Sequence, residues 1–377
     1  PELFALLHTL PNVETWQLHK SENEGAQNFA DDRIANLDES TAHWLKLSAN
    51  ADGTFAVTNG RTDAGARPRS DTTVPGRLLV LNKDDATFVA VDPDSGAILG
   101  TVPVGQGPHE LVVSTDGKYA FASNYGTGPA PGKTISMIDL AAMKEIRRID
   151  VSPLSRPHGL DFAGGKLYFT AEASRKIARY DPASDKIDWE FETGQATTHM
   201  VLVTRDRKTI FTSNIGSGTL SRIQQGSNGA WAQSVIPVGK GPEGIDVSPD
   251  GKEIWSARSQ DGGVSVIDAA TGAVKQTIDV GTKRSNRIKL TPDGTFALIS
   301  DDESGDLVVL DAPARTVTKR IALGSHPEGI VIAPDGSRAF VAVNADNTIA
   351  VIDLKTWQVT KKLHTGAGPD GMAWVGR

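Results

Sequence analysis

The sequence contains no cysteine among its 377 residues. Disulfide bonds, thiolate nucleophiles and cysteine-ligated zinc sites are therefore excluded. It also lacks an apolar run of the length that spans a bilayer, so we expect no membrane span. Positive charge is in deficit, with a net charge of −7, so we expect no nucleic-acid partner.

Glycine and proline are abundant instead, with 38 and 20 residues, and they separate many short apolar segments that we interpret as strands. One phrase organises the chain, GPHELVVSTDGKYAFASN at 107–124, in which a Thr-Asp-Gly turn joins two strands. It returns at 241–258, 285–301 and 326–343, and looser copies begin at 156–162 and 197–203.

The middle residue of the triplet that opens each phrase is called the anchor here. The anchors are His109, His158, His199, Glu243, Arg287, Glu328 and Asp370. Successive anchors lie 41 to 49 residues apart, and the longest interval contains an inserted loop at 125–133. A period in the low forties with four strands per unit is typical of a β-propeller blade.

Both ends of the repeat fit a closed ring. Three strands, at 77–82, 87–92 and 97–102, precede the first anchor, and one strand, at 371–376, follows the last. Together they complete one composite blade. We therefore predict an all-β fold, a seven-bladed β-propeller over residues 77–377, closed by pairing of the C-terminal strand with the first blade.

The first 76 residues do not follow the repeat. We expect a small α+β segment over 1–60, with a short helix at 2–10 and a β-hairpin from strands at 44–49 and 54–59. Residues 61–76 are rich in Arg, Pro, Gly, Ser and Thr and are interpreted as a linker.

Two resemblances carry expectations. The repeated phrases, with an Asp closing the third strands, resemble the YVTN family of seven-bladed propellers, which implies the fold and little about function. Residues 34–62 resemble the C-terminal tail of metallo-β-lactamase-fold hydrolases, although the metal motif of that family is absent. That likeness implies that the chain is cut from a longer protein, in which the propeller would accompany a metallo-hydrolase.

In a propeller the anchors surround one mouth of the central channel, and the ends of the second strands form a tier just outside. Three consecutive anchors are histidines, with Asp370 beside His109 and Glu243 beside His199. Glu172 adds a carboxylate from the blade of His158. Two or three imidazoles with one carboxylate suit a divalent metal ion, and zinc, magnesium and calcium all remain open.

The spacing of His109, His158 and Glu172 also resembles the metal-dependent site of virginiamycin B lyase, a propeller enzyme that opens a cyclic ester by elimination. The resemblance implies that His109 and Glu172 hold the metal and that His158 is the general base. The predicted catalytic residues are therefore His158 and Glu172, and the predicted metal ligands also include His109 and His199.

Other mouth residues are predicted to line the rim. Arg287 is expected to pair with Glu243 and Glu328. Tyr125 on the inserted loop is expected to stack on a ligand, with the loop acting as a lid or wall. The remaining rim candidates are Asn124, Asn214, Arg258 and Asp370. The alternative for the histidines is that each hydrogen-bonds a neighbouring backbone carbonyl.

The leading functional hypothesis is a metal-assisted hydrolase or lyase that acts on an ester or lactone small molecule at the channel mouth. The alternative is a non-catalytic propeller that presents a rigid face to a protein or cell-envelope partner. The family resemblance favours a periplasmic or secreted location, although no export signal is present in the sequence.

Overall fold

The computed structural model describes residues 45–49, 55–59 and 76–376. The chain divides into two units at residue 72, which are described separately. In the first unit, β1 (Leu45–Ala49) pairs antiparallel with β2 (Phe55–Asn59), which confirms the predicted hairpin. The helix predicted at 2–10 and most of the predicted linker lie outside the described residues.

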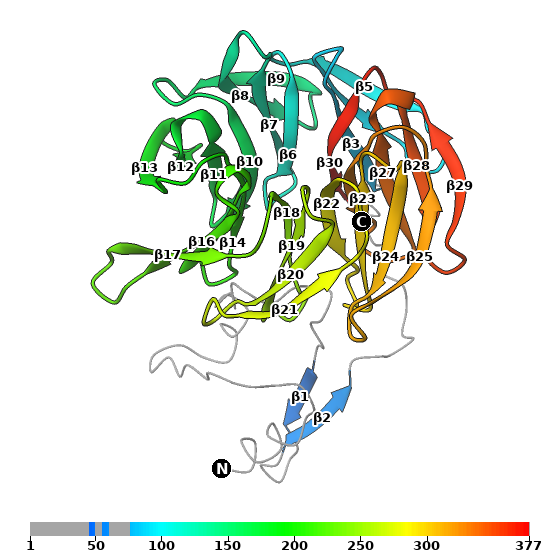
Figure 1. The fold of residues 1–377 in the computed structure, drawn as a ribbon. Helices are drawn as coiled ribbons and strands as arrows, with labels where there is room; N and C mark the ends of the chain where they lie inside the picture. Colours follow the sequence, from blue (N-terminus) through cyan, green and yellow to red (C-terminus); the bar gives the residue numbers. More distant parts are fainter. Residues whose placement is uncertain (1–44, 50–54, 60–75, 377) are drawn as a thin grey trace. The chain divides into compact units, whose positions relative to one another are not determined.

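The second unit is a ring of seven four-stranded antiparallel sheets (Figure 1). Six sheets use four consecutive strands. The seventh has the order β30-β3-β4-β5, so that the last strand of the chain pairs with the first strand of the propeller. The predicted composite blade and its closure are confirmed.

The strands fall into four classes by their place in the blade. The innermost strands are β6 (Pro108–Val113), β10 (Pro157–Ala163), β14 (Thr198–Val203), β18 (Pro242–Val247), β22 (Ser285–Leu290), β26 (Pro327–Ile332) and β30 (Pro369–Val375). The second strands are β7 (Tyr119–Gly126), β11 (Lys166–Ala171), β15 (Thr209–Asn214), β19 (Glu253–Arg258), β23 (Phe296–Asp301), β27 (Arg338–Val343) and β3 (Arg77–Asn82).

The outer half of each blade is equally regular. The third strands are β8 (Pro131–Asp139), β12 (Lys176–Asp181), β16 (Thr219–Gln225), β20 (Gly263–Asp268), β24 (Asp306–Asp311), β28 (Thr348–Asp353) and β4 (Thr87–Val91). The fourth strands are β9 (Lys144–Asp150), β13 (Lys186–Glu192), β17 (Trp231–Pro237), β21 (Val274–Asp279), β25 (Thr316–Ala322), β29 (Gln358–Leu363) and β5 (Ile98–Pro103). Three single 3-10 turns follow second strands: η1 (Glu172–Ser174), η2 (Ile215–Ser217) and η3 (Asn344–Asp346).

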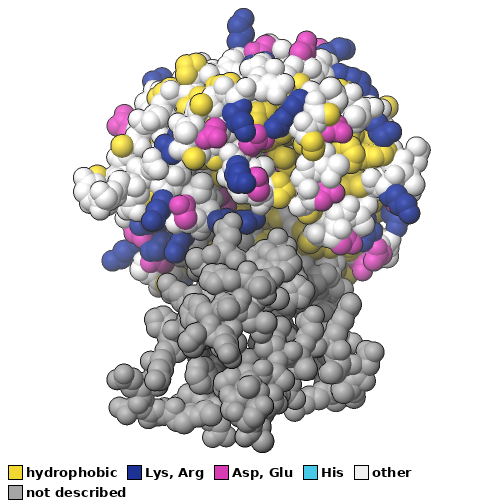
Figure 2. Space-filling view, turned by 90° about the horizontal axis from the view of Figure 1, so that it is seen from below, with side chains coloured by type: hydrophobic (Ala, Val, Ile, Leu, Met, Phe, Trp, Pro, Cys, Tyr) yellow, Lys and Arg dark blue, Asp and Glu magenta, His cyan; other side chains and the backbone are white. Residues whose placement is uncertain are grey.

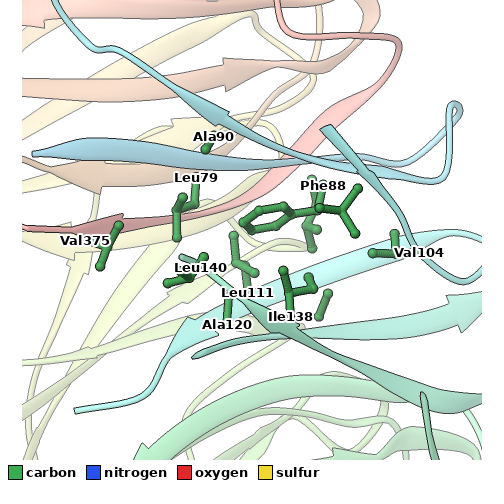
Figure 3. Close-up of a cluster of buried hydrophobic side chains, with 12 residues drawn as sticks. Leu79, Phe88, Ala90, Val104, Leu111, Ala120, Ile138, Leu140 and Val375 are labelled. Atoms are coloured by element: carbon green, nitrogen blue, oxygen red, sulfur yellow. The ribbon is translucent and has the colours of Figure 1, made fainter. Parts of the chain in front are cut away.

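The core lies between neighbouring blades. The second and third strands are buried on both faces, as in β19 and β20, whereas the fourth strands are largely exposed. Figure 3 shows one such layer, in which Leu79 and Phe88 of the composite blade meet Leu111 and Ile138 of the next blade. Each blade is apolar on both faces, so the ring must close to cover them.

A repeated β-bulge shapes the mouth. In the first complete blade, His109 and Glu110 of β6 stand opposite the single residue Ser123 of β7. Similar shifts occur at the anchors of the other blades. A bulge places two consecutive residues against one and re-aims their side chains. Where the residue after the anchor is not glycine, as at Glu110, the blade therefore brings two neighbouring side chains to the channel.

Hydroxyl groups beneath the bulges connect one blade to the next. Thr170 accepts a hydrogen bond from the amide of Gly159 at 2.9 Å and donates one to the carbonyl of His199 in the neighbouring blade at 2.6 Å. Ser213 and Ser300 donate in the same way to the carbonyls of the next anchors. The backbone that carries the anchors is thus fixed from blade to blade.

Charges of both signs are interspersed on the face drawn in Figure 2, without a large patch of one sign. This distribution agrees with the small negative net charge. In the part of the chain that the structure describes, no helix has the length and apolar character needed to cross a bilayer.

Candidate active site at the channel mouth

The three anchor histidines lie against one another, as predicted. The ring centroid of His158 is 3.8 Å from that of His199 and 5.2 Å from that of His109. The ring of Tyr125 lies 4.6 Å from His109 and 5.4 Å from His158. Together with Glu172, these four side chains are called the histidine sector.

Glu172 connects three blades within the histidine sector. It begins η1, after β11, and one carboxylate oxygen accepts a hydrogen bond from the hydroxyl of Tyr125 at 2.7 Å. The other oxygen lies 3.0 Å from Nδ1 of His199. Burial acts to raise the pKa of Glu172, but the hydrogen bonds from His199 and Tyr125 prevail and hold it below its usual range. Glu172 is therefore ionised at neutral pH.

Burial keeps two of the histidines neutral. It lowers the pKa of His109 to about 4, against the opposing charge of Asp370, and it holds the pKa of His158 well below the usual value. His109 donates Nδ1–H to the carbonyl of Gly107 at 2.8 Å, as in the alternative interpretation of the histidines. Among the described residues, neither His158 nor His199 forms a hydrogen bond to a backbone carbonyl through its ring.

Three buried polar atoms at the mouth have no hydrogen-bond partner among the described residues. They are Nδ1 of His158, Nε2 of His199 and Oδ1 of Asp370. The three residues are 3%, 8% and 2% exposed. Because buried polar groups are nearly always satisfied, such atoms indicate a place where water or a ligand binds.

The second half of the ring is held by an arginine that reaches across the channel. Arg287 on β22 forms an ion pair with Glu110 on β6 and lies 3.8 Å from Asp370. In the described chain it makes no ion pair with Glu243 or Glu328, so the predicted pairing was wrong. The bulge explains the difference, because it brings the residue after the anchor to the channel as well.

Lys83 adds a second cation to this half of the ring. Its ammonium group lies 3.3 Å from both Glu328 and Asp370, and although burial opposes it, these charges raise the pKa of Lys83. Burial and Asp370 raise the pKa of Glu328 to about 8, whereas Lys83 and Arg287, working against burial, lower that of Asp370 to about 2. Asp370 therefore carries the negative charge of this pair.

Sequence reasoning missed three residues of this half, namely Lys83, Glu110 and Asn286. Asn286 donates to Glu243 at 3.1 Å and accepts from Arg287 at 2.8 Å. The sequence contained a signal for two of them. Four blades have glycine after the anchor, where Glu110 stands, and most blades have proline before the anchor, where Asn286 stands. Lys83 had no such signal. These residues with Glu243, Arg287, Glu328 and Asp370 are called the carboxylate sector.

The residues predicted as metal ligands do not fit an ion well. Both oxygens of Glu172 are engaged by Tyr125 and His199, and Nδ1 of His109 donates to a carbonyl. The rings of His158 and His199 lie against each other in a tilted arrangement, with 31° between their planes. Among the described residues, no group of three or more His, Asp or Glu is arranged to hold a metal. We therefore derive no step through a metal.

The outer tier is mainly structural. Asn124 accepts from the amide of Gly105 at 2.9 Å and donates to Ser136 at 3.0 Å, while Asn214 donates to Ser221. Arg258 donates to a backbone carbonyl and pairs with Asp261. We give these three predicted rim residues no substrate role, because their polar atoms already fasten loops and strands.

The predicted loop at 125–133 is largely a continued hairpin, since β7 extends to Gly126 and β8 begins at Pro131. Arg156 of the next blade lies over the ring of Tyr125, 4.7 Å from its centroid, and donates to the carbonyls of Thr127 and Gly128. Tyr125 is therefore clamped in the wall of the site.

A cavity of about 300 Å³ lies away from the mouth, between the blade of β26–β29 and the composite blade. Its two cations, Arg338 and Lys361, both bond to Asp94. The three unsatisfied atoms of His158, His199 and Asp370 lie at the mouth and not in this cavity.

Comparison with solved structures supports the fold. A putative 6-phosphogluconolactonase of Bacteroides fragilis is 18% identical, with a TM-score of 0.67, over 81% of this chain and 99% of its own. A periplasmic gluconolactonase of Pseudomonas aeruginosa is 18% identical, with a TM-score of 0.65, over 80% and 99%. Hydrazine synthase of Kuenenia stuttgartiensis is 19% identical, with a TM-score of 0.65, over 74% and 92%.

No curated protein matches the sequence. The resemblances to YVTN propellers, to virginiamycin B lyase and to metallo-β-lactamase tails stay predictions. A family model described as lactonase, 7-bladed β-propeller, matches residues 38–365, which is most of the chain. The protein therefore belongs to the seven-bladed β-propeller lactonase family.

Proposed function

We propose that this protein hydrolyses lactones at the channel mouth, with the His199–Glu172 pair as its general base. Membership of the lactonase family supports the reaction class, as do the names of two structural neighbours, a putative 6-phosphogluconolactonase and a gluconolactonase. The observation that carries the assignment is the state of His199. One ring nitrogen is bound to a carboxylate, while the other has no hydrogen-bond partner among the described residues.

The pair has the arrangement that general-base catalysis needs. The ionised Glu172 accepts Nδ1–H of His199, which fixes the tautomer and leaves the lone pair on Nε2. It also stabilises the imidazolium that forms when Nε2 takes a proton. The hydroxyl of Tyr125 holds Glu172 from the opposite side. Sequence reasoning gave the base role to His158, but His158 has no carboxylate partner in the described chain.

The reaction balances with water as the only co-reactant. Nε2 of His199 removes a proton from water, whose oxygen attacks the lactone carbonyl carbon. The tetrahedral intermediate collapses with cleavage of the bond from that carbon to the ring oxygen. The departing alkoxide takes the proton from the imidazolium, and the product is an open-chain hydroxy acid.

His158 is placed to polarise the carbonyl. Its low pKa keeps the imidazole neutral, and its Nδ1 has no hydrogen-bond partner in the described part of the chain. A neutral imidazole with the proton on Nδ1 donates a hydrogen bond to the carbonyl oxygen and strengthens it as negative charge develops there. The predicted metal is not needed for this step.

The test is a pH-stat assay of the purified protein with glucono-δ-lactone, with the uncatalysed rate subtracted. We expect saturable acid release that is unchanged after treatment with a chelator. A rate equal to the background at every protein concentration would refute the proposal. Activity that chelation abolishes and zinc restores would return the metal to the mechanism.

A further inference from the structure

Building on the proposed lactone hydrolysis, we infer that the mouth selects an uncharged, hydroxyl-bearing lactone and rejects its phosphorylated form. The cations of the carboxylate sector, Lys83 and Arg287, and Arg284 beside them are already bound to carboxylates. The inference therefore concerns which substrate the same site accepts.

The two cations of the carboxylate sector, the half-buried Lys83 and the buried Arg287, already form internal ion pairs. Lys83 lies 3.3 Å from Glu328 and from Asp370. Arg287 is paired with Glu110 and lies 3.8 Å from Asp370. If either cation turned towards a phosphate, it would leave a buried carboxylate without compensation, and that exchange is unfavourable.

A third cation, Arg284, lies nearer the solvent and is neutralised as well. One of its nitrogens lies 2.5 Å from Asp302, and the other lies 3.9 Å from Glu243. A phosphate dianion is best held by an arginine fork with free donors. Here the fork faces carboxylates, and their negative charge would repel the phosphate.

Other cations on loops of the same face, Arg175, Lys240 and Lys283, are exposed. Water and salt screen exposed charges strongly over roughly 8 Å at physiological ionic strength. We therefore expect them to contribute little to phosphate binding at the channel.

The same groups suit hydroxyl groups. Glu243 is buried and, within residues 76–376, its carboxylate accepts one hydrogen bond, from Asn286. Its remaining acceptor capacity is available to a hydroxyl donor. The unpartnered Oδ1 of Asp370 is a second buried acceptor. The rings of His109, beside Asp370, and of Tyr125 offer an aromatic wall against which a lactone ring can pack.

The test compares kcat/KM for glucono-δ-lactone and for 6-phosphoglucono-δ-lactone under identical conditions. We expect the uncharged lactone to be favoured at least tenfold. Equal or greater activity on the phosphorylated lactone would overturn this inference and leave the proposed function standing. Hydrolysis of neither compound would overturn both.

The substitution Asp302→Asn tests the electrostatic cause. It frees Arg284 of its closest carboxylate, so kcat/KM for the phosphorylated lactone should rise about fivefold, while that for the uncharged lactone stays unchanged. The control is Asp94→Asn on the opposite face, where Asp94 pairs with Arg338 at 2.7 Å. Unchanged discrimination in Asp302→Asn, or the same rise in the control, would contradict the role given to these ion pairs.

Discussion

Arg287 and Glu110 form an ion pair across the central channel, although 177 residues separate them in the sequence. Their strands, β22 and β6, belong to blades on opposite sides of the ring. The ion pair connects opposite blades at the mouth, and its arginine compensates the negative charges of Glu110 and Asp370 in the carboxylate sector.

Removal of the arginine should destabilise the protein strongly. Arg287→Met leaves Glu110 and Asp370 buried without their shared cation, and breaking a buried ion pair costs about 3–5 kcal/mol. Urea unfolding monitored by tryptophan fluorescence measures the change. Arg338→Met is the matched control, because its partner Asp94 is largely exposed and the pair should be worth less than about 1 kcal/mol. An equal decrease in the free energy of unfolding in the two variants would show that the channel ion pair stabilises the protein no more than the surface pair does.

The hydroxyl of Tyr125 should act on the reaction only through Glu172. Tyr125→Phe keeps the ring against His109 but removes the hydroxyl that stabilises the ionised carboxylate, so the pKa of Glu172 should rise. Because Glu172 then takes up its proton at a higher pH, the acid limb of the kcat/KM profile should move to higher pH, and kcat should fall about three- to tenfold. A lower kcat without movement of the acid limb would indicate a packing role alone.

The closure of the ring should be sensitive to a single methyl group. A Cβ added at Gly371 would lie 2.0 Å from the backbone oxygen of His109, so Gly371→Ala should cost at least about 2 kcal/mol as an overpacking change. The control is Gly128→Ala, because nothing lies within 4 Å of a Cβ there. The difference in Tm between the two variants is the measurement, and equal Tm values would contradict the packing described for β30 and β6.

Acid should weaken the fold through the neutral histidines. The pKa of His109 is about 4 in the folded protein and about 6.5 in the unfolded chain, so the unfolded chain takes up the proton first as pH falls. This residue should therefore remove on the order of 3 kcal/mol from the free energy of unfolding between pH 6.5 and 4. In His109→Gln the decline over that range should be shallower by this amount, as measured by urea unfolding at several pH values. Parallel curves for the two proteins would argue against a depressed pKa.

The propeller could be predicted from the sequence because its signal is local and repeated. Each blade repeats one phrase of strands and Asp-Gly turns, and the surplus strands at the two ends fit one blade. The meeting of His109, His158 and His199 followed from the same regularity, since equivalent positions in a ring come together.

Partners within the site could not be predicted, because they depend on how the bulge aims each side chain. The sequence placed Arg287 between two glutamates, yet its partner is Glu110 on the far side of the channel. Glu172 was assigned to a metal, whereas its oxygens meet Tyr125 and the histidine of the next blade. Side-chain direction at a bulge is set in three dimensions and leaves little trace in spacing alone.

The central claim is that His199, held by Glu172, removes the proton from the attacking water. The most direct measurement is kcat/KM for glucono-δ-lactone in His199→Gln, compared with His364→Gln at an exposed histidine away from the anchors. The account predicts a loss of at least about 100-fold in His199→Gln, as expected for removal of a general base, and wild-type activity in His364→Gln. Activity of His199→Gln within threefold of the wild type, in a protein that remains folded, would contradict it.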